Sequence, residues 1–266
     1  MNGPVALITG GSSGIGLAVA RKWVAGGGRA ALVARTEPRL RQVVAELGEE
    51  NAAAFPLDVT DLAALARLPQ RVVERFGRID LLVNNAGVHH RGPLLELTAE
   101  ELAEMIAANL SAPLVLTRAA APLLRPGSAI VNVASLAGMV PVPNAAGYSA
   151  SKAGLRAFTR AAADELAGRG IHVGAVSPGP VDSGFFGDAA RVTPLVFSQP
   201  MSSPEEVADA VLRCARERRF EIALPWASGK LATLSYLSRR FSRAVRPLLE
   251  KRGARNKRRY LERRKK

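Results

Sequence analysis

A tyrosine and a lysine four residues apart are the side chains best suited to acid–base chemistry. Tyr148 and Lys152 lie in the run Gly147–Gly154, and on a helix this i, i+4 spacing places both side chains on one face. A phenol has a reference pKa of about 10, and a neighbouring ammonium lowers that pKa toward neutrality. The pair is short, so the alternative is an exposed tyrosine and a solvated lysine on a surface helix.

Two polar residues upstream could act with this pair. Ser135 directly follows the apolar run Ala129–Ala134, which reads as a buried strand. Asn109 falls inside a long helix that a capping box at Thr98 is predicted to open. Asparagine has low helix propensity, so its place there indicates either a function or a kink, and Pro113 favours the kink.

The elements that must position these residues alternate between strands and helices. We predict strands at residues 5–9, 30–34, 52–57, 80–83, 129–134, 171–176 and 220–224, with helices between them. Pro69 is a point where the helix at 62–76 could divide. The alternation predicts an α/β fold, a Rossmann-type doubly wound parallel seven-stranded sheet with helices on both faces. Ligands of such sheets bind along the edge where the strands' carboxyl ends meet.

A glycine-rich turn follows the first predicted strand. The run Thr9–Gly16 contains Gly10, Gly14 and Gly16 and leads into a helix predicted to end near Ala25. Glycines there allow a tight turn and a close approach of the backbone to a pyrophosphate, and the helix N-terminus offers free N–H groups. The sequence therefore predicts a dinucleotide site, against the alternative of a plain turn.

Residues after the next strands point to the adenosine end of that cofactor. NAD sites of this kind place a carboxylate after the second strand, whereas this sequence has Ala34 followed by Arg35. A guanidinium can bind a 2′-phosphate through two hydrogen bonds, so Arg35 favours NADP(H); the alternative is an exposed loop residue. Asp58 is a candidate partner of the adenine amino group, and Asn84–Gly87 offers amide and small side chains for the nucleotide pocket.

Composition narrows the class of protein. The chain has 266 residues, 48% of them hydrophobic, which suits one large domain. The apolar run Val5–Ile8 follows Met1 with no room for a signal peptide, and no stretch approaches the 18 uncharged apolar residues of a spanning helix. Cys214 is the one cysteine, which excludes an intrachain disulfide. We expect a cytoplasmic location.

The net charge of +14 is concentrated at one end of the chain. Residues 239–266 hold fourteen Lys or Arg and two Glu, a local charge of +12 that leaves +2 for the other 238 residues. We therefore predict a Rossmann-fold catalytic domain at 1–228 and a basic amphipathic helix and tail at 229–266. The predicted apolar face of that helix comprises Leu231, Leu234, Leu237, Phe241, Val245 and Leu248, and Pro247 is expected to limit the helix.

Taken together, residues 4–224 resemble the short-chain dehydrogenase/reductase superfamily. Thr9-Gly10 with Gly14 and Gly16 is similar to the family's cofactor motif, Asn84–Gly87 to its Asn-Asn-Ala-Gly, and Pro178-Gly179 to its turn after the sixth strand. Asn109, Ser135, Tyr148 and Lys152 match its catalytic tetrad. Ser183 stands where many relatives have Thr, and the chain continues for about forty residues where carrier-protein reductases end.

The resemblance implies a role for each of these residues. Tyr148 would be the general acid or base, Lys152 would lower its pKa and hold the nicotinamide ribose, Ser135 would hydrogen-bond the carbonyl oxygen, and Asn109 would hold a water. No metal ligands are expected. The predicted cofactor contacts are Gly10, Ser12, Ser13, Gly14, Ile15, Gly16, Arg35, Asp58, Val59, Asn85, Ala86, Gly87, Tyr148, Lys152, Pro178, Gly179, Val181 and Ser183.

The leading interpretation is an NADP(H)-dependent oxidoreductase that interconverts a carbonyl and an alcohol. The substrate is expected to be lipophilic, and if the tail attaches to a membrane it would enter from the bilayer past Phe185, Phe186 and Phe197. The alternatives are a non-catalytic NADP-binding or interaction protein and a 3-oxoacyl-thioester reductase. We expect a homodimer or homotetramer. His89 and His90 follow the Asn-Asn-Ala-Gly loop near the expected substrate entrance, but we assign neither a catalytic part.

Three interpretations of the basic tail remain open. Its apolar face could pack on the enzyme body or a second subunit, with the last residues solvated and disordered. It could lie on an anionic membrane surface, or bind nucleic acid or an acidic protein, of which nucleic acid is not expected. If the tail is separate from the catalytic domain, deletion from Lys251 onward should leave turnover of a soluble ketone intact.

Overall fold

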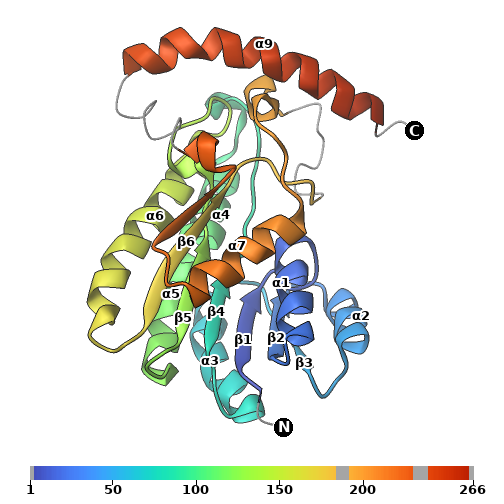
Figure 1. Ribbon diagram of the computed structural model, residues 1–266, viewed down its shortest axis with the longest axis vertical. Coiled ribbons are helices and arrows are strands. Elements are labelled where there is room, and N and C mark those ends of the chain that lie inside the picture. The colour runs from blue at the N-terminus through green and yellow to red at the C-terminus, as the bar shows by residue number, and fades with distance from the viewer. Residues whose placement is uncertain (1–2, 184–191, 230–238, 264–266) are drawn as a thin grey trace.

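The computed structural model describes residues 3–183, 192–229 and 239–263, with side chains of the last range described from 246 onward. Seven strands in these ranges form one sheet, in the order β3-β2-β1-β4-β5-β6-β7 (Figure 1). Every neighbouring pair is parallel, as the sequence predicts. The strands are β1 Val5–Thr9, β2 Arg29–Ala34, β3 Ala52–Pro56, β4 Leu81–Asn84, β5 Ala129–Val133, β6 His172–Pro178 and β7 Glu221–Leu224.

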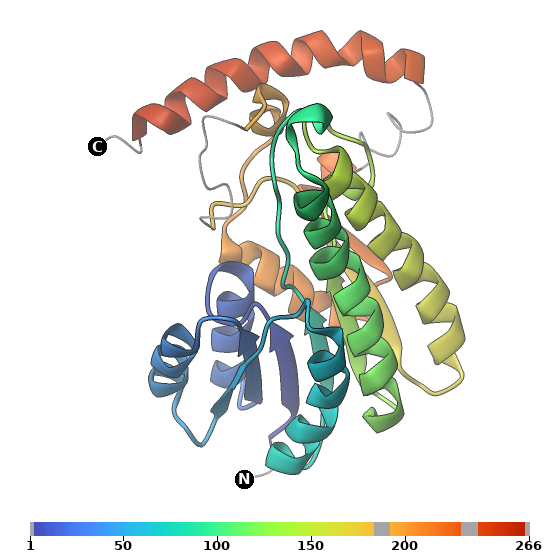
Figure 2. The same ribbon diagram turned by 180° about the vertical axis from the view of Figure 1, so that it is seen from behind.

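Helices cover both faces of the sheet, and the two views in Figures 1 and 2 show the layers from opposite sides. One face carries α1 (Gly14–Ala25), α2 (Glu37–Leu47) and α7 (Pro204–Arg216). The other carries α3 (Leu62–Phe76), α5 (Ala112–Ala120) and α6 (Ala146–Ala167). Two apolar clusters therefore fill the space between sheet and helices, one on each face, which explains why the strands are apolar on both sides.

Short helices mark the turns around these elements. They are η1 (Leu94–Glu96), η3 (Ala121–Leu123), η4 (Leu136–Gly138) and η6 (Pro194–Ser198). Pro69 does not divide α3, which runs unbroken from Leu62 to Phe76. Pro69 is buried within that helix, so packing against the sheet compensates for the hydrogen bond that proline cannot donate.

The helix predicted after Thr98 is interrupted at the point where Asn109 lies. The capping box of Thr98 and Glu101 opens α4 (Ala99–Ile106), a π-helical turn η2 (Ala107–Ser111) follows, and α5 continues. The irregularity that the sequence indicates at Asn109 is thus a π-helical turn. By length and composition, residues 99–123 could cross a membrane, with 44% of the apolar window buried within the protein. This run contacts α3 and α6 in the helical layer, as the core helix of a globular fold does.

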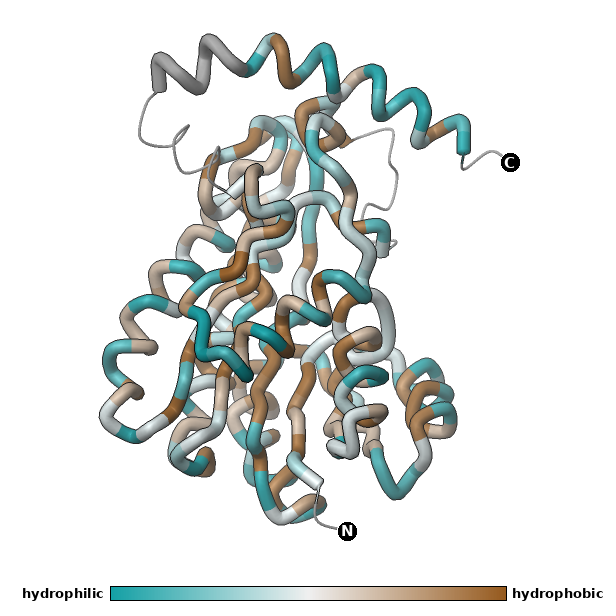
Figure 3. Tube along the Cα trace, viewed as in Figure 1, coloured by the Kyte–Doolittle hydropathy of each residue, from teal (hydrophilic) through white to brown (hydrophobic). Residues whose placement is uncertain are grey.

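The basic end of the chain forms α9 (Arg239–Arg263). Figure 1 shows it lying across the end of the molecule opposite the N-terminus, and Figure 3 shows that its described part is mainly hydrophilic. The expectation that Pro247 limits the helix is wrong, because Pro247 lies inside it. Residues 251–263 are helical, which removes the disordered end from the first of the three interpretations of the tail. Contacts with the body near Gly253 and Tyr260 compensate for the missing donor of Pro247.

Only part of the predicted apolar face of the tail lies within the described residues. Leu231, Leu234 and Leu237 lie outside the described residues, as do the side chains of Phe241 and Val245. Leu248 is 71% exposed, so it does not pack on the body. The division into domains at residue 228 stays a prediction.

Candidate functional site

The glycine-rich turn has the backbone geometry that its sequence predicts. Gly10 and Gly14 have φ values of 68° and 51°, which lie in the left-handed region that favours glycine. A Cβ on Gly16 would lie 2.2 Å from the carbonyl oxygen of Gly10, so any larger residue would push α1 away from β1. The turn thus brings the N-terminus of α1 to the carboxyl edge of the sheet, where its N–H groups face an anion site.

The loop after β4 is tied to the end of β1. The Thr9 hydroxyl accepts hydrogen bonds from the backbone N–H groups of Asn85 at 2.9 Å and Ala86 at 3.0 Å. The Asn85 amide donates to the Thr9 carbonyl at 2.9 Å. Asn84 instead points into the protein, where its amide donates to Asn132 on β5 at 2.8 Å. Asn84 is therefore a buried structural residue. Asn85–Gly87 instead lines the larger of two cavities at this edge of the sheet, which we call the cofactor cavity because its walls hold most of the predicted cofactor contacts.

Ser135, Tyr148 and Lys152 come together beside that cavity. Ser135 follows β5, and Tyr148 and Lys152 lie one turn apart near the start of α6. The hydroxyls of Ser135 and Tyr148 share a hydrogen bond. The ammonium of Lys152 donates to the carbonyl of Val133 at 2.8 Å and lies 5.8 Å from the centre of the Tyr148 ring. In this group Tyr148 can donate a proton, Ser135 offers a hydroxyl that can polarise a carbonyl group, and Lys152 supplies a nearby positive charge.

Burial dominates the ionisation of the tyrosine and the lysine. Burial raises the pKa of Tyr148, and the hydrogen bond from Ser135 and the charge of Arg91 oppose it without reversing it. Burial also lowers the pKa of Lys152 to about 8. The expected lowering of the Tyr148 pKa below its reference value is therefore wrong for this structure, because desolvation of the phenolate outweighs the nearby charges.

Asn109 connects three segments around the site. Its amide nitrogen donates to the Val88 carbonyl at 2.9 Å and to the Ser151 hydroxyl at 3.1 Å. Its amide oxygen accepts from the Val88 N–H at 2.8 Å. The side chain, fully buried, thus joins the π-helical turn η2 to the loop after Gly87 and to α6. Its expected role in holding a water stays a prediction.

Two neighbouring cavities share Ser135, Tyr148 and Gly179 in their walls. The larger has a volume of about 380 Å³. Its walls hold most of the predicted contact residues, namely Gly10, Ser13, Gly14, Ile15, Asn85, Ala86, Gly87, Tyr148, Lys152, Pro178, Gly179, Val181 and Ser183. A Cβ on Gly14 would approach Ser183 to 3.2 Å, so the absence of a side chain there keeps this cradle open. Its shape, glycines and helix N-terminus fit a dinucleotide.

The remaining predicted contacts lie outside that cavity. Gly16 is buried beneath the turn, and Ser12 turns its carbonyl toward Arg39, whose Nε lies 3.4 Å away. Val59 lines a small separate hollow behind Thr9. Arg39 was not predicted from the sequence, because a lone arginine in α2 carries no motif, yet it lies next to the glycine-rich turn.

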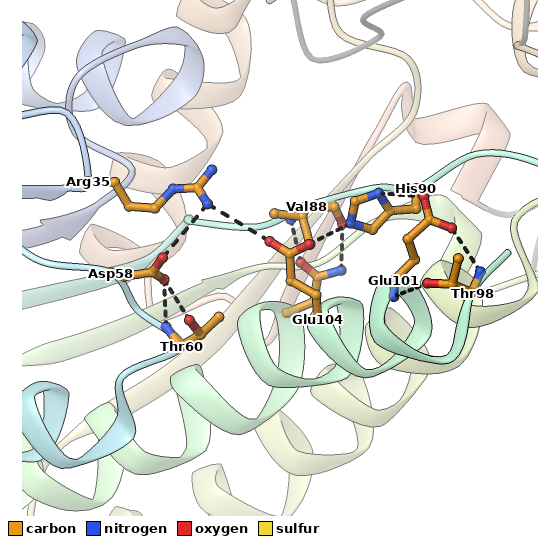
Figure 4. A network of polar contacts seen from close by, with 9 residues as sticks. Arg35, Asp58, Thr60, Val88, His90, Thr98, Glu101 and Glu104 are labelled. Carbon is orange, nitrogen blue, oxygen red and sulfur yellow. Dashed lines mark hydrogen bonds and ion pairs between the residues drawn. The ribbon is translucent and has the colours of Figure 1, made fainter.

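Arg35 and Asp58 face one another at the adenosine end, as Figure 4 shows. The Arg35 guanidinium lies 3.7 Å from Asp58 and 3.9 Å from Glu104, and 64% of its side chain is exposed. Burial acts to raise the pKa of Asp58, but hydrogen bonds from Thr60 and the charge of Arg35 together hold it below its usual value. These long, exposed ion pairs are weak, so Arg35 is held only loosely by its two carboxylate neighbours.

The smaller cavity also borders Tyr148 and has a volume of about 90 Å³. His89 stacks on the Tyr148 ring with 3.9 Å between centroids, and burial lowers the His89 pKa to about 3, which keeps the imidazole neutral. Arg91 lines the same cavity. The sequence analysis places His89 near the expected substrate entrance without a catalytic part, whereas it does not single out Arg91, which belongs to no motif.

Phe197 does not line this cavity. It is 2% exposed and packs under Tyr260 of α9, with 5.4 Å between ring centroids. The expectation that Phe197 borders the substrate entrance is therefore wrong, because the tail helix covers it. Phe185 and Phe186 lie outside the described residues.

Known proteins match both the sequence and this arrangement. The profile of the family described as short chain dehydrogenase matches residues 4–191. The chain belongs to the short-chain dehydrogenase/reductase family. It is accordingly an oxidoreductase that acts on CH–OH groups and uses a nicotinamide cofactor.

Individual family members share most of the chain. Ketoacyl reductase 1 of the granaticin polyketide synthase of Streptomyces violaceoruber, whose name marks the assignment as provisional, is 41% identical over 186 residues, 68% of either chain. D-threitol dehydrogenase of Mycolicibacterium smegmatis is 34% identical over 229 residues, 82% of this chain and 87% of the relative. A short chain dehydrogenase from Burkholderia cenocepacia J2315, crystallised in complex with NADP, has a TM-score of 0.76, 33% identity and coverage of 84% and 96%.

Proposed function

We propose that this enzyme reduces a carbonyl compound to an alcohol with NADPH, or catalyses the reverse reaction, with Tyr148 as the general acid or base. The observation that carries this is the shared wall: Ser135 and Tyr148 border the cofactor cavity on one side and the smaller cavity on the other. A carbonyl group in the smaller cavity would thus lie between the proton donor and the cofactor.

Each residue of the site has a chemical task in this reaction. The cofactor supplies the hydride when bound. Ser135 donates a hydrogen bond to the carbonyl oxygen, which stabilises the negative charge that develops there. Tyr148 gives its proton to the same oxygen. Its raised pKa keeps it protonated in the reducing direction, and the charge of Lys152 stabilises the phenolate left after transfer.

The preference for NADPH rests on the charges at the adenosine end. Ala34, directly before Arg35, occupies the position where NAD sites carry a carboxylate. Arg39 adds a second guanidinium beside the glycine-rich turn. Two cations near a 2′-phosphate favour NADPH over NADH, because guanidinium groups bind phosphate through charge-assisted hydrogen bonds. The Burkholderia relative with bound NADP supports the same choice.

The substrate is proposed to be lipophilic. Val142, Pro143, Ala145, Pro180 and Val196 give the smaller cavity apolar walls. A 3-oxoacyl thioester is the specific alternative, since one relative is named a ketoacyl reductase. Comparing kcat/KM for a simple aryl ketone and for a 3-oxoacyl thioester decides between them.

Replacing Tyr148 with Phe tests the proposed chemistry. The ring stays and the proton donor is lost, so kcat should fall about 10²-fold to 10⁴-fold, the scale of general acid catalysis. NADPH affinity, measured by fluorescence quenching, should stay unchanged. Normal turnover by this variant would contradict the assignment of the acid, and absence of NADPH oxidation by the parent with every carbonyl compound tested would favour a non-catalytic binding protein.

We also propose a cytoplasmic homodimer or homotetramer whose α9 makes peripheral contact with anionic membrane surfaces. Lys251, Arg255 and Arg258 are exposed on α9, and Leu248 beside them is 71% exposed. Cations near such a surface contribute about 1 kcal/mol each. Sedimentation with anionic vesicles at low salt should capture the protein, and neutral vesicles should not. Reversal of these three charges to Glu should abolish capture, whereas the same reversal at Arg67, Arg169 and Arg213, exposed elsewhere, should not.

A further inference from the structure

The end of the chain is docked against the substrate side of the site. Four residues of α9 face the segment around η6, and we call them the docking row: Gly253, Asn256, Lys257 and Tyr260. Their spacing of three, one and three residues places them on one face of a helix. The remaining residues of the described helix that carry exposed charge, such as Arg255 and Arg258, lie on other faces.

Each member of the docking row makes a specific contact. Asn256 donates to the Phe197 carbonyl at 3.0 Å, and Lys257 donates to the Val192 carbonyl at 2.7 Å. The Tyr260 hydroxyl lies 3.2 Å from the carboxylate of Asp182. The bonds from Asn256 and Lys257 satisfy backbone carbonyls of a segment, residues 192–198, that has no sheet partner of its own among the described residues.

Gly253 permits the helix to approach this closely. A Cβ on Gly253 would lie 1.8 Å from the Pro194 carbonyl oxygen and 3.1 Å from the Ser198 nitrogen. Gly253 is buried, although it lies in the middle of a helix where glycine costs about 1 kcal/mol relative to alanine. A residue that weakens the helix is thus placed at the one contact where a side chain would not fit.

The carbonyls held by α9 adjoin residues that line the substrate cavity. Thr193 and Val196 are part of its wall, and we call this pair the substrate wall. Lys257 binds the carbonyl one residue before Thr193, and Asn256 binds the carbonyl one residue after Val196. Both ends of the substrate wall are therefore fixed by the tail helix.

Tyr260 joins the substrate side to the cofactor side. Its ring packs on Phe197, next to Val196, while its hydroxyl reaches Asp182. Asp182 lies between Val181 and Ser183, which border the cofactor cavity. A shift of α9 would therefore move the walls of both cavities near the place where they meet.

We propose that the docking row of α9 sets the substrate specificity of this enzyme by fixing the position of the substrate wall. The residues of the row are positioning residues, since they contact the wall from outside the cavity. The inference rests on the proposed carbonyl reduction for its kinetic readout. It applies to a segment that lies beyond the residues matched by the family profile.

Two matched pairs of variants test the proposal. Gly253→Val introduces a side chain against Pro194, and Ala254→Val adds the same side chain at the exposed neighbouring position. Asn256→Ala removes the bond to Phe197, and Arg255→Ala shortens the exposed residue beside it. For each we would measure kcat and KM with a small aliphatic ketone and with a bulky aryl ketone, and the dissociation constant of NADPH.

The expected result is a change in specificity rather than a uniform loss. Gly253→Val and Asn256→Ala should raise KM for the preferred ketone about tenfold and change the ratio of the two kcat/KM values about fivefold or more, because small displacements in a pocket alter discrimination on this scale. The controls should behave as the parent. A destabilised but otherwise normal site would lower both kcat/KM values equally, so an unchanged ratio and KM would overturn the proposal.

Hydrogen exchange separates this inference from the proposed function. Backbone amides of residues 192–198 should exchange faster in Gly253→Val and Asn256→Ala than in the two controls, whether or not the parent reduces any ketone tested. Unchanged exchange would overturn the docking role even if turnover by the parent confirms the enzyme. Faster exchange with an inactive parent would reject the reduction of those ketones while retaining the docking. If Gly253→Val fails to fold, Asn256→Ala decides.

Discussion

Lys152 is a cationic side chain that is almost completely buried. Burial lowers its pKa from 10.5 to about 8. Below pH 8 the lysine is protonated in both the folded and unfolded states, so the full penalty of burying the charge is present. Between pH 8 and 10.5 the unfolded state binds the extra proton, and the free energy of unfolding therefore rises with pH in that window.

Removing this charge should stabilise the protein while harming its chemistry. Lys152→Met keeps an unbranched side chain. At pH 7 the variant avoids the cost of burying a charge, up to about 3 kcal/mol, and loses a hydrogen bond that contributes about 1 kcal/mol. Urea unfolding should show a more stable variant at pH 7 and a smaller difference at pH 9.5, with turnover greatly reduced. A less stable variant at pH 7 would show that the charge is compensated in the fold.

Arg35 offers a second test at a single side chain. Arg35→Ser should weaken NADPH binding about tenfold to a hundredfold, the scale of one partly exposed charge pair with a phosphate. NADH affinity should remain as it is, since NADH lacks the 2′-phosphate. Arg41→Ser is the matched control, because Arg41 is exposed and paired with Glu37 in the same helix. Equal loss for both cofactors would point to a structural defect.

The helix of residues 99–120 is interrupted by a π-helical turn, and this turn determines where Asn109 lies. The π-helical turn turns its amide toward Val88 and Ser151. Replacing Asn109 with Ala leaves the half-buried N–H and C=O of Val88 without these partners, which should cost about 1–3 kcal/mol of unfolding free energy. Thermal unfolding measures the loss, and NADPH affinity should fall with it because Val88 adjoins Gly87 of the cofactor cavity. Ser111→Ala, in the same turn, serves as control.

The strands and the placement of Tyr148 and Lys152 on one helix were predictable because both leave regular marks in the sequence. Apolar runs such as Val5–Ile8 and the i, i+4 spacing of Tyr148 and Lys152 report local geometry directly. The net pKa of Tyr148 was not predictable, because it depends on burial by residues distant in sequence. His89, Arg91 and the covering of Phe197 by Tyr260 are likewise contacts between separate segments, which no local pattern encodes.

For the whole molecule, the charge contrast between body and tail does not show that the two act independently. The tail is basic, yet its docking row reaches the substrate wall, and Tyr260 bridges to Asp182. A chain ending at Glu250 should therefore lose about tenfold or more in kcat/KM while it still binds NADPH, because the residues around the cofactor cavity end at Ser183. A chain ending at Arg263 is the control. Full turnover by the shorter chain would restore the view that the tail is separable.

The docking row lies near the end of the chain, so it is synthesised after the strands of the sheet. Ribosomes release the sheet through Leu224 well before Gly253 emerges, roughly 30 residues later, which is a few seconds of translation at about 5–20 residues per second. A nascent chain can thus assemble a dinucleotide site before its substrate side is complete. We expect products cut short by a premature stop codon, or trimmed by a carboxypeptidase, to bind reduced nicotinamide as the full chain does while oxidising it more slowly.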